Sequence, residues 1–169
     1  MAAAWIVESS KYYGFTETSN RDQIVGWANF LGPKSFSDTF EPNGNVSDWC
    51  GVFAGICMKK AGIAIPANYQ DPSAWLNFGD ALPVPVEGCV GVFQKFVGQK
   101  LVYHVGFIMG VTDQGHYVLR GGNQNNRVYD SVFAKPRLVQ CRWPSKTARP
   151  DTFMKKLVLP DMAFCKTED

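Results

Sequence analysis

Apolar residues recur at helical spacing in the first third of the chain. This pattern predicts one helix over residues 5–13 and a second over residues 24–31. The apolar face of the first helix consists of Trp5, Ile6, Ser9, Tyr12 and Tyr13. Asn20 is a candidate N-cap for the second helix, and Gly32-Pro33 ends it.

A third helix is predicted over residues 49–61, after a long loop. Residues 34–48 are rich in Ser, Gly, Asn and Pro, which is typical of a loop. Ser47 or Asp48 would cap the helix, and Lys59-Lys60 would lie at its negatively polarised C-terminal end. Its buried stripe consists of Val52, Phe53, Ile56 and Cys57. We expect this helix to be central, with Cys50 in its first turn.

The second half of the chain has the pattern of a β-sheet. After a short helix over residues 72–78, β-branched and aromatic runs predict strands at residues 89–96, 101–111, 116–120 and 137–143. Helices followed by an antiparallel sheet indicate an α+β domain. At 169 residues the chain can fill one core. We expect one domain over residues 1–145 and a C-terminal extension over residues 146–169 that packs on it.

The charge balance and the apolar runs argue against some partners. Seventeen basic and fifteen acidic residues give a formal charge of +2, and no basic run alternates with aromatic residues, so we expect no nucleic-acid binding. The N-terminus lacks the features of a signal peptide, and no apolar run reaches membrane-spanning length. We therefore expect synthesis in the cytoplasm without a signal peptide and no membrane insertion.

The five cysteines predict neither a disulfide framework nor a metal site. They are Cys50, Cys57, Cys89, Cys141 and Cys165, an odd set without short paired spacings. A chain made in a reducing compartment should keep most of them as buried thiols. With only His104 and His116 to join them, zinc ligands would stand at unusual spacing. We expect no metal and no other cofactor.

Cys50 is the cysteine best placed for chemistry. A helix N-terminus stabilises a thiolate through its N–H groups and the positive end of its dipole. A lone cysteine in an apolar helix is more often a core residue. The assignment of a nucleophile therefore depends on a base nearby.

The predicted hairpin of residues 101–123 supplies a base. A turn centred on Asp113-Gln114 pairs Val111 with His116, Gly110 with Tyr117, Ile108 with Leu119, Gly106 with Gly121 and His104 with Asn123. An amide oxygen of Asn123 would then fix the tautomer of His104. A slip of one residue would remove this pairing. Gln124 and Asn125 remain alternatives, because an Asn-rich string is also typical of a turn.

The same alternation assigns residues to the two faces of the hairpin. Gly106, Gly110 and Gly121 share the face of His104, where their missing side chains would let the helix with Cys50 approach. Val105, Phe107, Met109 and Val111 fill the other face. His116 falls at the hairpin tip, where we expect a solvated turn residue.

Four short motifs stand in a fixed order along the chain. They are Asp48-Trp49-Cys50-Gly51-Val52-Phe53, Ala61-Gly62-Ile63, His104-Val105-Gly106-Phe107 and Gly121-Gly122-Asn123-Gln124. Together they resemble the NlpC/CHAP superfamily of papain-like cell-wall cysteine peptidases and amidases, in particular its short phage-associated and secreted-toxin members, over residues 27–143. The resemblance implies a papain-like fold with Cys50 as nucleophile, its N–H at the oxyanion, His104 as base and Asn123 as third residue. Tyr103 departs from the pattern, which usually has glycine there.

The resemblance also implies a function. The chain would cleave an amide bond in bacterial peptidoglycan, as a stem-peptide endopeptidase or an amidase, and Asp48, Trp49, Tyr103 and Gln124 would contact the substrate. It would act in the periplasm or cell wall after delivery by a secretion system, as an antibacterial effector with a cognate immunity protein, or as a phage lysis enzyme. Alternatives are a papain-like acyltransferase or thioesterase, and a non-catalytic phage structural or binding module.

Overall fold

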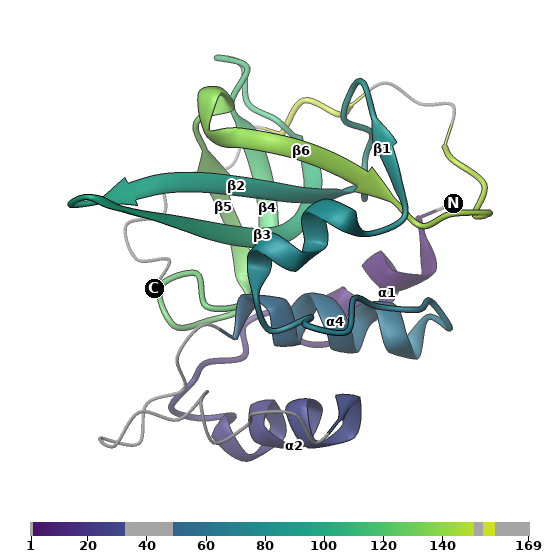
Figure 1. The fold of residues 1–169 in the computed structure, drawn as a ribbon, viewed down its shortest axis with the longest axis vertical. Coiled ribbons are helices and arrows are strands. Elements are labelled where there is room, and N and C mark those ends of the chain that lie inside the picture. The colour runs from purple at the N-terminus through teal and green to yellow at the C-terminus, as the bar shows by residue number, and fades with distance from the viewer. Residues whose placement is uncertain (1, 33–48, 151–153, 158–169) are drawn as a thin grey trace.

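In the computed structural model, helices lie against one face of a six-stranded antiparallel sheet (Figure 1). The structure describes residues 2–32, 49–150 and 154–157. The helices are α1 (Ala4–Ser10), α2 (Arg21–Leu31), α4 (Cys50–Lys60) and the 3-10 helices η1 (Pro72–Asn77) and η2 (Lys135–Arg137). The strands are β1 (Asp80–Leu82), β2 (Val90–Val97), β3 (Lys100–Val111), β4 (Tyr117–Gly121), β5 (Tyr129–Phe133) and β6 (Leu138–Trp143), in the order β1-β6-β2-β3-β4-β5. The predicted α+β class is confirmed.

The two N-terminal helices lie close to their predicted positions. α1 ends at Ser10, before the predicted end, because residues 11–14 form a turn in which the N–H of Lys11 donates to the carbonyl of Glu8. Asn20 is the N-cap residue of α2, as predicted, but its side chain makes no capping hydrogen bond to the helix. Its Oδ1 instead accepts from the backbone N–H of Thr16, at 3.1 Å. Gly32, at φ 146°, ends α2.

α4 is buried all around rather than along one stripe. Every residue from Cys50 to Met58 is buried. The reason is that α4 lies between two layers: the ring of Phe53 lies 6.3 Å from Trp27 of α2 and 6.0 Å from Phe107 of β3. The N-cap is Trp49. The predicted caps, Ser47 and Asp48, lie outside the described residues.

Four strands follow the predicted ranges within one residue at each end, and two were missed. β1 is only three residues long and is followed by Pro83, so it is too short to show alternation. β5 follows the Asn-rich string, where no strand was predicted. It pairs with β4 from Tyr117–Phe133 to Gly121–Tyr129 and forms one edge of the sheet.

The predicted register of the β3–β4 hairpin is right in its middle and wrong at its tip. Ile108 pairs with Leu119 as predicted. Toward the tip, Gly110 pairs with Val118 and Val111 with Tyr117, one residue away from the prediction. A β-bulge between Ile108 and Gly110 leaves Met109 as the extra residue and absorbs the difference. The β3–β4 ladder ends at the pair of Phe107 with Arg120, so His104 and Asn123 are not ladder partners.

The prediction that α4 packs on the His104 face is wrong. Phe53 of α4 contacts Phe107, which alternates with His104 along β3 and so lies on the opposite face. The glycines of the His104 face accommodate other neighbours. A Cβ on Gly106 would lie 2.6 Å from the carbonyl oxygen of Arg120 and 2.9 Å from the Leu119 side chain.

The described part of the C-terminal extension lies along β3. Val111 donates its N–H to the carbonyl of Lys155 and accepts from the N–H of Leu157, at 2.9 and 2.8 Å. A Cβ on Gly110 would approach the Lys155 carbonyl to 2.6 Å, so this contact requires glycine. The extension beyond residue 157 lies outside the described residues.

Candidate active site

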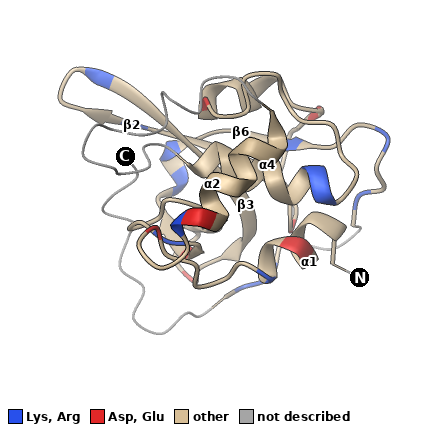
Figure 2. Ribbon diagram, turned by 90° about the horizontal axis from the view of Figure 1, so that it is seen from below, with Lys and Arg blue, Asp and Glu red and all other residues tan. Residues whose placement is uncertain are grey.

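Cys50 is the first residue of α4 and is 3% exposed. The next residue fixes the backbone around it. A Cβ on Gly51 would lie 2.1 Å from the carbonyl oxygen of Tyr69 and 2.9 Å from that of Gln70, so only glycine fits. Lys59 and Lys60 lie in the last turn of the same helix (Figure 2). Cys50 therefore occupies the end of α4 where the helix dipole favours negative charge.

His104 is 1% exposed and lies on β3 among aromatic side chains. Its ring stacks on Phe133 with a centroid distance of 5.2 Å and an interplanar angle of 15°. Its cross-strand partner on β2 is Phe93, whose ring lies 5.0 Å from that of Phe133. This packing restricts the imidazole to one orientation.

Gln124 contacts the imidazole directly. Its Oε1 lies 3.3 Å from Nε2 of His104. Its Nε2 donates to the carbonyls of Leu119 and Tyr129 and to the hydroxyl of Ser131, at 3.1, 2.5 and 3.3 Å. Because the amide nitrogen faces these acceptors, the amide oxygen must face the histidine. A neutral His104 then carries its proton on Nε2 and its lone pair on Nδ1.

The loop after β4 directs Gln124 into the protein. Asn123, Asn125 and Asn126 have φ values of 56°, 51° and 57°, and the N–H of Gln124 donates to the carbonyl of Arg127 at 3.1 Å. The interpretation of this string as a left-handed turn is confirmed. Gln124 is fully buried and Asn123 is 3% exposed. Gln124, one of the three candidates for the third position, contacts His104 directly.

Two glycines connect the surroundings of His104 to the start of α4. A Cβ on Gly121 would lie 3.1 Å from Nε2 of His104. A Cβ on Gly122 would lie 2.6 Å from Cβ of Phe53 and 2.7 Å from the ring of Trp49, which precedes Cys50. Figure 1 shows the β4–β5 loop reaching the end of α4 where the helix begins. Two successive residues at the end of β4, Gly121 and Gly122, thus lie against His104 of β3 and against Trp49 and Phe53 at the start of α4.

Of the four residues predicted to contact substrate, two are buried, one is half-buried and one lies outside the described residues. Trp49 is fully buried and its indole N–H donates to a carboxylate oxygen of Glu17 at 3.3 Å, so it packs in the core. Gln124 is likewise covered by protein and holds His104. Tyr103 is half-buried beside His104 on β3. Asp48 lies outside the described residues.

His116 lies in the loop between β3 and β4, as expected. It is half-buried, and its Nδ1 accepts from the backbone N–H of Lys135 at 3.4 Å. Among the described residues, no three or more His, Cys, Asp or Glu side chains cluster as they would around a metal ion. No helix within the described ranges is long and apolar enough to cross a membrane.

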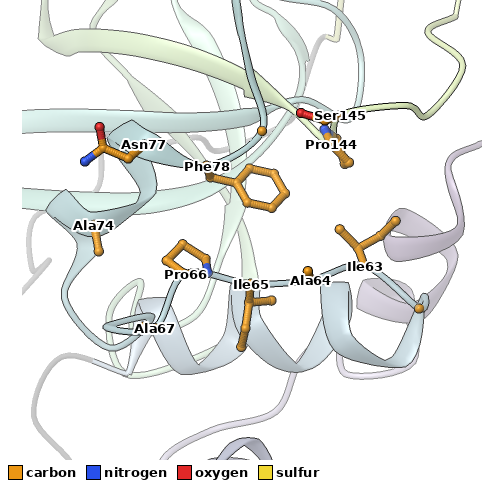
Figure 3. A pocket seen from close by; sticks show the side chains of 12 residues that line it. Ile63, Ala64, Ile65, Pro66, Ala67, Ala74, Asn77, Phe78, Pro144 and Ser145 are labelled. Atoms are coloured by element: carbon orange, nitrogen blue, oxygen red, sulfur yellow. The ribbon is translucent and has the colours of Figure 1, made fainter.

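A cavity of about 550 Å³ lies alongside α4 (Figure 3). Figure 3 shows Ile63 and Pro66, which follow α4, on one side of it and Phe78 and Pro144 on the other. Gly62 at one rim lies roughly 18 Å along α4 from Cys50. Residues 63–67 run back along the helix toward Tyr69, whose carbonyl oxygen a Cβ on Gly51 would approach to 2.1 Å.

Comparisons with protein-family models, with curated proteins and with solved structures find no match to this chain. The likeness to the NlpC/CHAP superfamily therefore rests on the four motifs and their order.

Proposed function

We propose that this protein is a cysteine hydrolase that cleaves an amide bond in bacterial peptidoglycan, with a papain-like fold in which Cys50 meets His104 at the start of α4 rather than across the packed face of the helix. The observation that carries the proposal is the contact between Gln124 and His104, because it gives the imidazole the tautomer that a general base needs. The reaction class follows from the cysteine and the histidine. The choice of peptidoglycan follows from the motif resemblance alone.

In this mechanism the two residues exchange a proton in turn. Nδ1 of His104 takes the thiol proton of Cys50, and the sulfur attacks the amide carbonyl carbon. The oxyanion that forms is held by the N–H of Cys50 at the start of α4. When the C–N bond breaks, the imidazolium gives its proton to the leaving amine, and an acyl-enzyme remains. His104 then takes a proton from water, whose oxygen attacks the acyl carbon and releases Cys50.

Gln124 would act on this reaction without touching the substrate. The hydrogen bond that it accepts from Nε2 of His104 also favours the protonated ring that forms during each proton transfer. Its own donors are satisfied by Leu119, Tyr129 and Ser131, so its orientation is set before substrate binds. It is a positioning residue in this proposal.

The test is incubation of purified protein with purified sacculi and mass spectrometry of the soluble products. The variants are Cys50→Ala and, as a matched control from the same helix, Cys57→Ala. We expect wild type and Cys57→Ala to release fragments whose masses identify the bond. Cys50→Ala should lose activity by at least about a thousandfold, because no other group replaces the nucleophile.

Two results would redirect the proposal. Release of the same fragments by Cys50→Ala would show that Cys50 is not the nucleophile. Hydrolysis of acyl esters or thioesters with no release from sacculi would favour the acyltransferase or thioesterase alternative. Inactivity of wild type in both assays would favour a non-catalytic module.

A further inference from the structure

The hairpin formed by β2 and β3 extends beyond the strands on either side of it (Figure 1). Among the described residues, β6 pairs with β2 as far as Phe93, and the ladder of β4 with β3 ends at Phe107. Beyond Phe93 the pairing of β2 with β3 continues for four more pairs, down to Val97 with Lys100. At about 3.3 Å per residue, this two-stranded ribbon projects roughly 13 Å from the sheet.

The end of the ribbon carries exposed apolar side chains. Phe96 is 71% exposed, the largest value among the large apolar side chains that the structure describes, and Val97 is 49% exposed. Because the two residues are successive on a strand, their side chains leave the ribbon on opposite faces. The turn follows directly, with Gly98 at a φ of 60°. The tip is therefore apolar on both of its faces.

Lysines flank this apolar tip. Lys95 precedes Phe96, and Lys100 is the cross-strand partner of Val97. Residues 88–112, which include both strands of the hairpin, contain no Asp or Glu. Figure 2 shows blue and no red on the hairpin that contains β2. A lysine can lay its apolar stem along such a tip while its amine reaches outward to an anion.

This combination matches the surface of an anionic lipid bilayer. In the interfacial region apolar and aromatic side chains leave water, while lysine amines meet lipid phosphates. A protein partner would need a pocket shaped to a convex tip, whereas a bilayer deforms around it. A hydrophilic polyanion would attract the lysines but leave Phe96 in water. Phe96 and Val97 therefore favour the bilayer as the partner.

We propose that the tip of the β2–β3 hairpin binds the surface of an anionic phospholipid bilayer. Phe96 and Val97 enter the interfacial region, and Lys95 and Lys100 contact the lipid headgroups. This contact is peripheral and requires no membrane-spanning segment. It needs neither Cys50 nor a substrate, so it stands or falls independently of the proposed hydrolase activity.

The first test is co-sedimentation with vesicles of phosphatidylcholine, with and without phosphatidylglycerol. We expect wild type and Cys50→Ala to bind at low salt only when phosphatidylglycerol is present. Lys100→Gln should weaken this binding about fivefold, and Phe96→Ala at least about fivefold. The matched control is Phe30→Ala, which removes a phenylalanine on α2 that is 62% exposed, and it should bind like wild type.

The Phe96→Trp variant tests whether the tip enters the lipid. All five native tryptophans are at most 7% exposed, so the fluorescence that this variant adds comes from the tip. Brominated phosphatidylcholine in the phosphatidylglycerol vesicles should quench the added fluorescence and leave that of wild type nearly unchanged. Thermal unfolding of each variant checks that it is folded.

Three results would overturn the proposal. They are failure of the folded wild type to bind phosphatidylglycerol vesicles, equal binding by Phe96→Ala and wild type, and no quenching of bound Phe96→Trp by brominated lipid. Binding of wild type to dextran sulfate but not to vesicles would assign the lysines to an anionic polymer instead.

Discussion

Gln124 holds the imidazole of His104 from a loop, whereas the sequence suggested a partner opposite it in the ladder. The predicted pairing of His104 with Asn123 assumed an unbroken β4, but β4 ends at Gly121 and left-handed residues follow. A turn changes the direction of successive side chains, so alternation no longer tells which of them faces the histidine. Sequence reasoning reached the tetrapeptide that contacts His104, but within it the register argument favoured Asn123 over Gln124.

The role of Gln124 in orienting His104 can be tested by comparing its substitution with that of the neighbouring residue Asn123. Gln124→Ala should lower kcat by about 10- to 100-fold and leave KM nearly unchanged, because the side chain is buried and orients His104 without contacting substrate. Asn123→Gly removes the neighbouring amide but keeps a residue that accepts the φ of 56°, so it should stay close to wild type. Steady-state kinetics on released amino groups, with thermal unfolding to check folding, separates them.

A larger loss of kcat in Asn123→Gly than in Gln124→Ala would instead assign the third catalytic position to Asn123. A rise in KM at constant kcat for Gln124→Ala would indicate that Gln124 binds substrate instead. Either outcome would contradict the positioning role argued from the His104 contact.

At the scale of elements, α1 is joined to α4 by a buried carboxylate. Glu8 of α1 accepts from the hydroxyl of Tyr12 at 2.6 Å, pairs with Lys11, and lies 3.8 Å from Nζ of Lys60 at the end of α4. Burial acts to raise the pKa of Glu8, but the hydrogen bonds from Lys11 and Tyr12 and the charges of Lys11 and Lys60 outweigh it, and the pKa is lowered. The charged form of Glu8 therefore stabilises the folded state.

This linkage predicts a pH-dependent stability difference. Because the pKa of Glu8 is lower in the folded protein, its contribution is complete above the unfolded value of 4.5 and is lost as the pH falls through the folded value. Glu8→Gln should lower the free energy of unfolding by about 1 to 2 kcal/mol near neutral pH. Urea denaturation at several pH values should show this difference shrinking as the solution becomes acidic.

A surface carboxylate provides the control for this experiment. Glu87 forms an ion pair with Lys155 at 3.1 Å, but the Lys155 side chain is 67% exposed, so Glu87→Gln should change stability little. A Glu8→Gln effect that is equally large at every pH would show that the charge of Glu8 is not its cause.

Helices and strands could be predicted from the sequence where their hydrophobic patterns extend over many residues. The helix of Cys50 and the strand of His104 carry runs of eleven and twelve residues and were found almost to the residue. β1 has only three residues, too few for a period to emerge. β5 is as long as β4, which was predicted, but its sequence Tyr-Asp-Ser-Val-Phe carries two adjacent polar residues and shows no alternation. The face on which α4 packs could not be predicted, because apolar residues occupy both faces of β3 and either one can form an interface.

At the scale of the whole molecule, the strand order of the sheet brings together residues that are far apart in the sequence. The order β1-β6-β2-β3-β4-β5 places the last strand between the first two, which pairs Cys141 of β6 with Gly91 of β2. The motif resemblance located Cys50, His104 and the Gly121–Gln124 string without this topology. The contacts of Gln124 became visible only with it.

The relative reactivity of all the thiols in the folded chain tests the central claim, that His104 activates Cys50. The folded, reduced protein is treated briefly with iodoacetamide near neutral pH, and alkylation at each cysteine is measured by mass spectrometry in wild type and in His104→Ala. Burial raises the pKa of Cys57 well above its usual range, so Cys57 is the internal reference for an inert thiol. We predict that Cys50 reacts at least about tenfold faster than Cys57 in wild type and loses this advantage in His104→Ala. Equal reactivity of Cys50 and Cys57, or a fast Cys50 that is unaffected by loss of His104, would contradict the account.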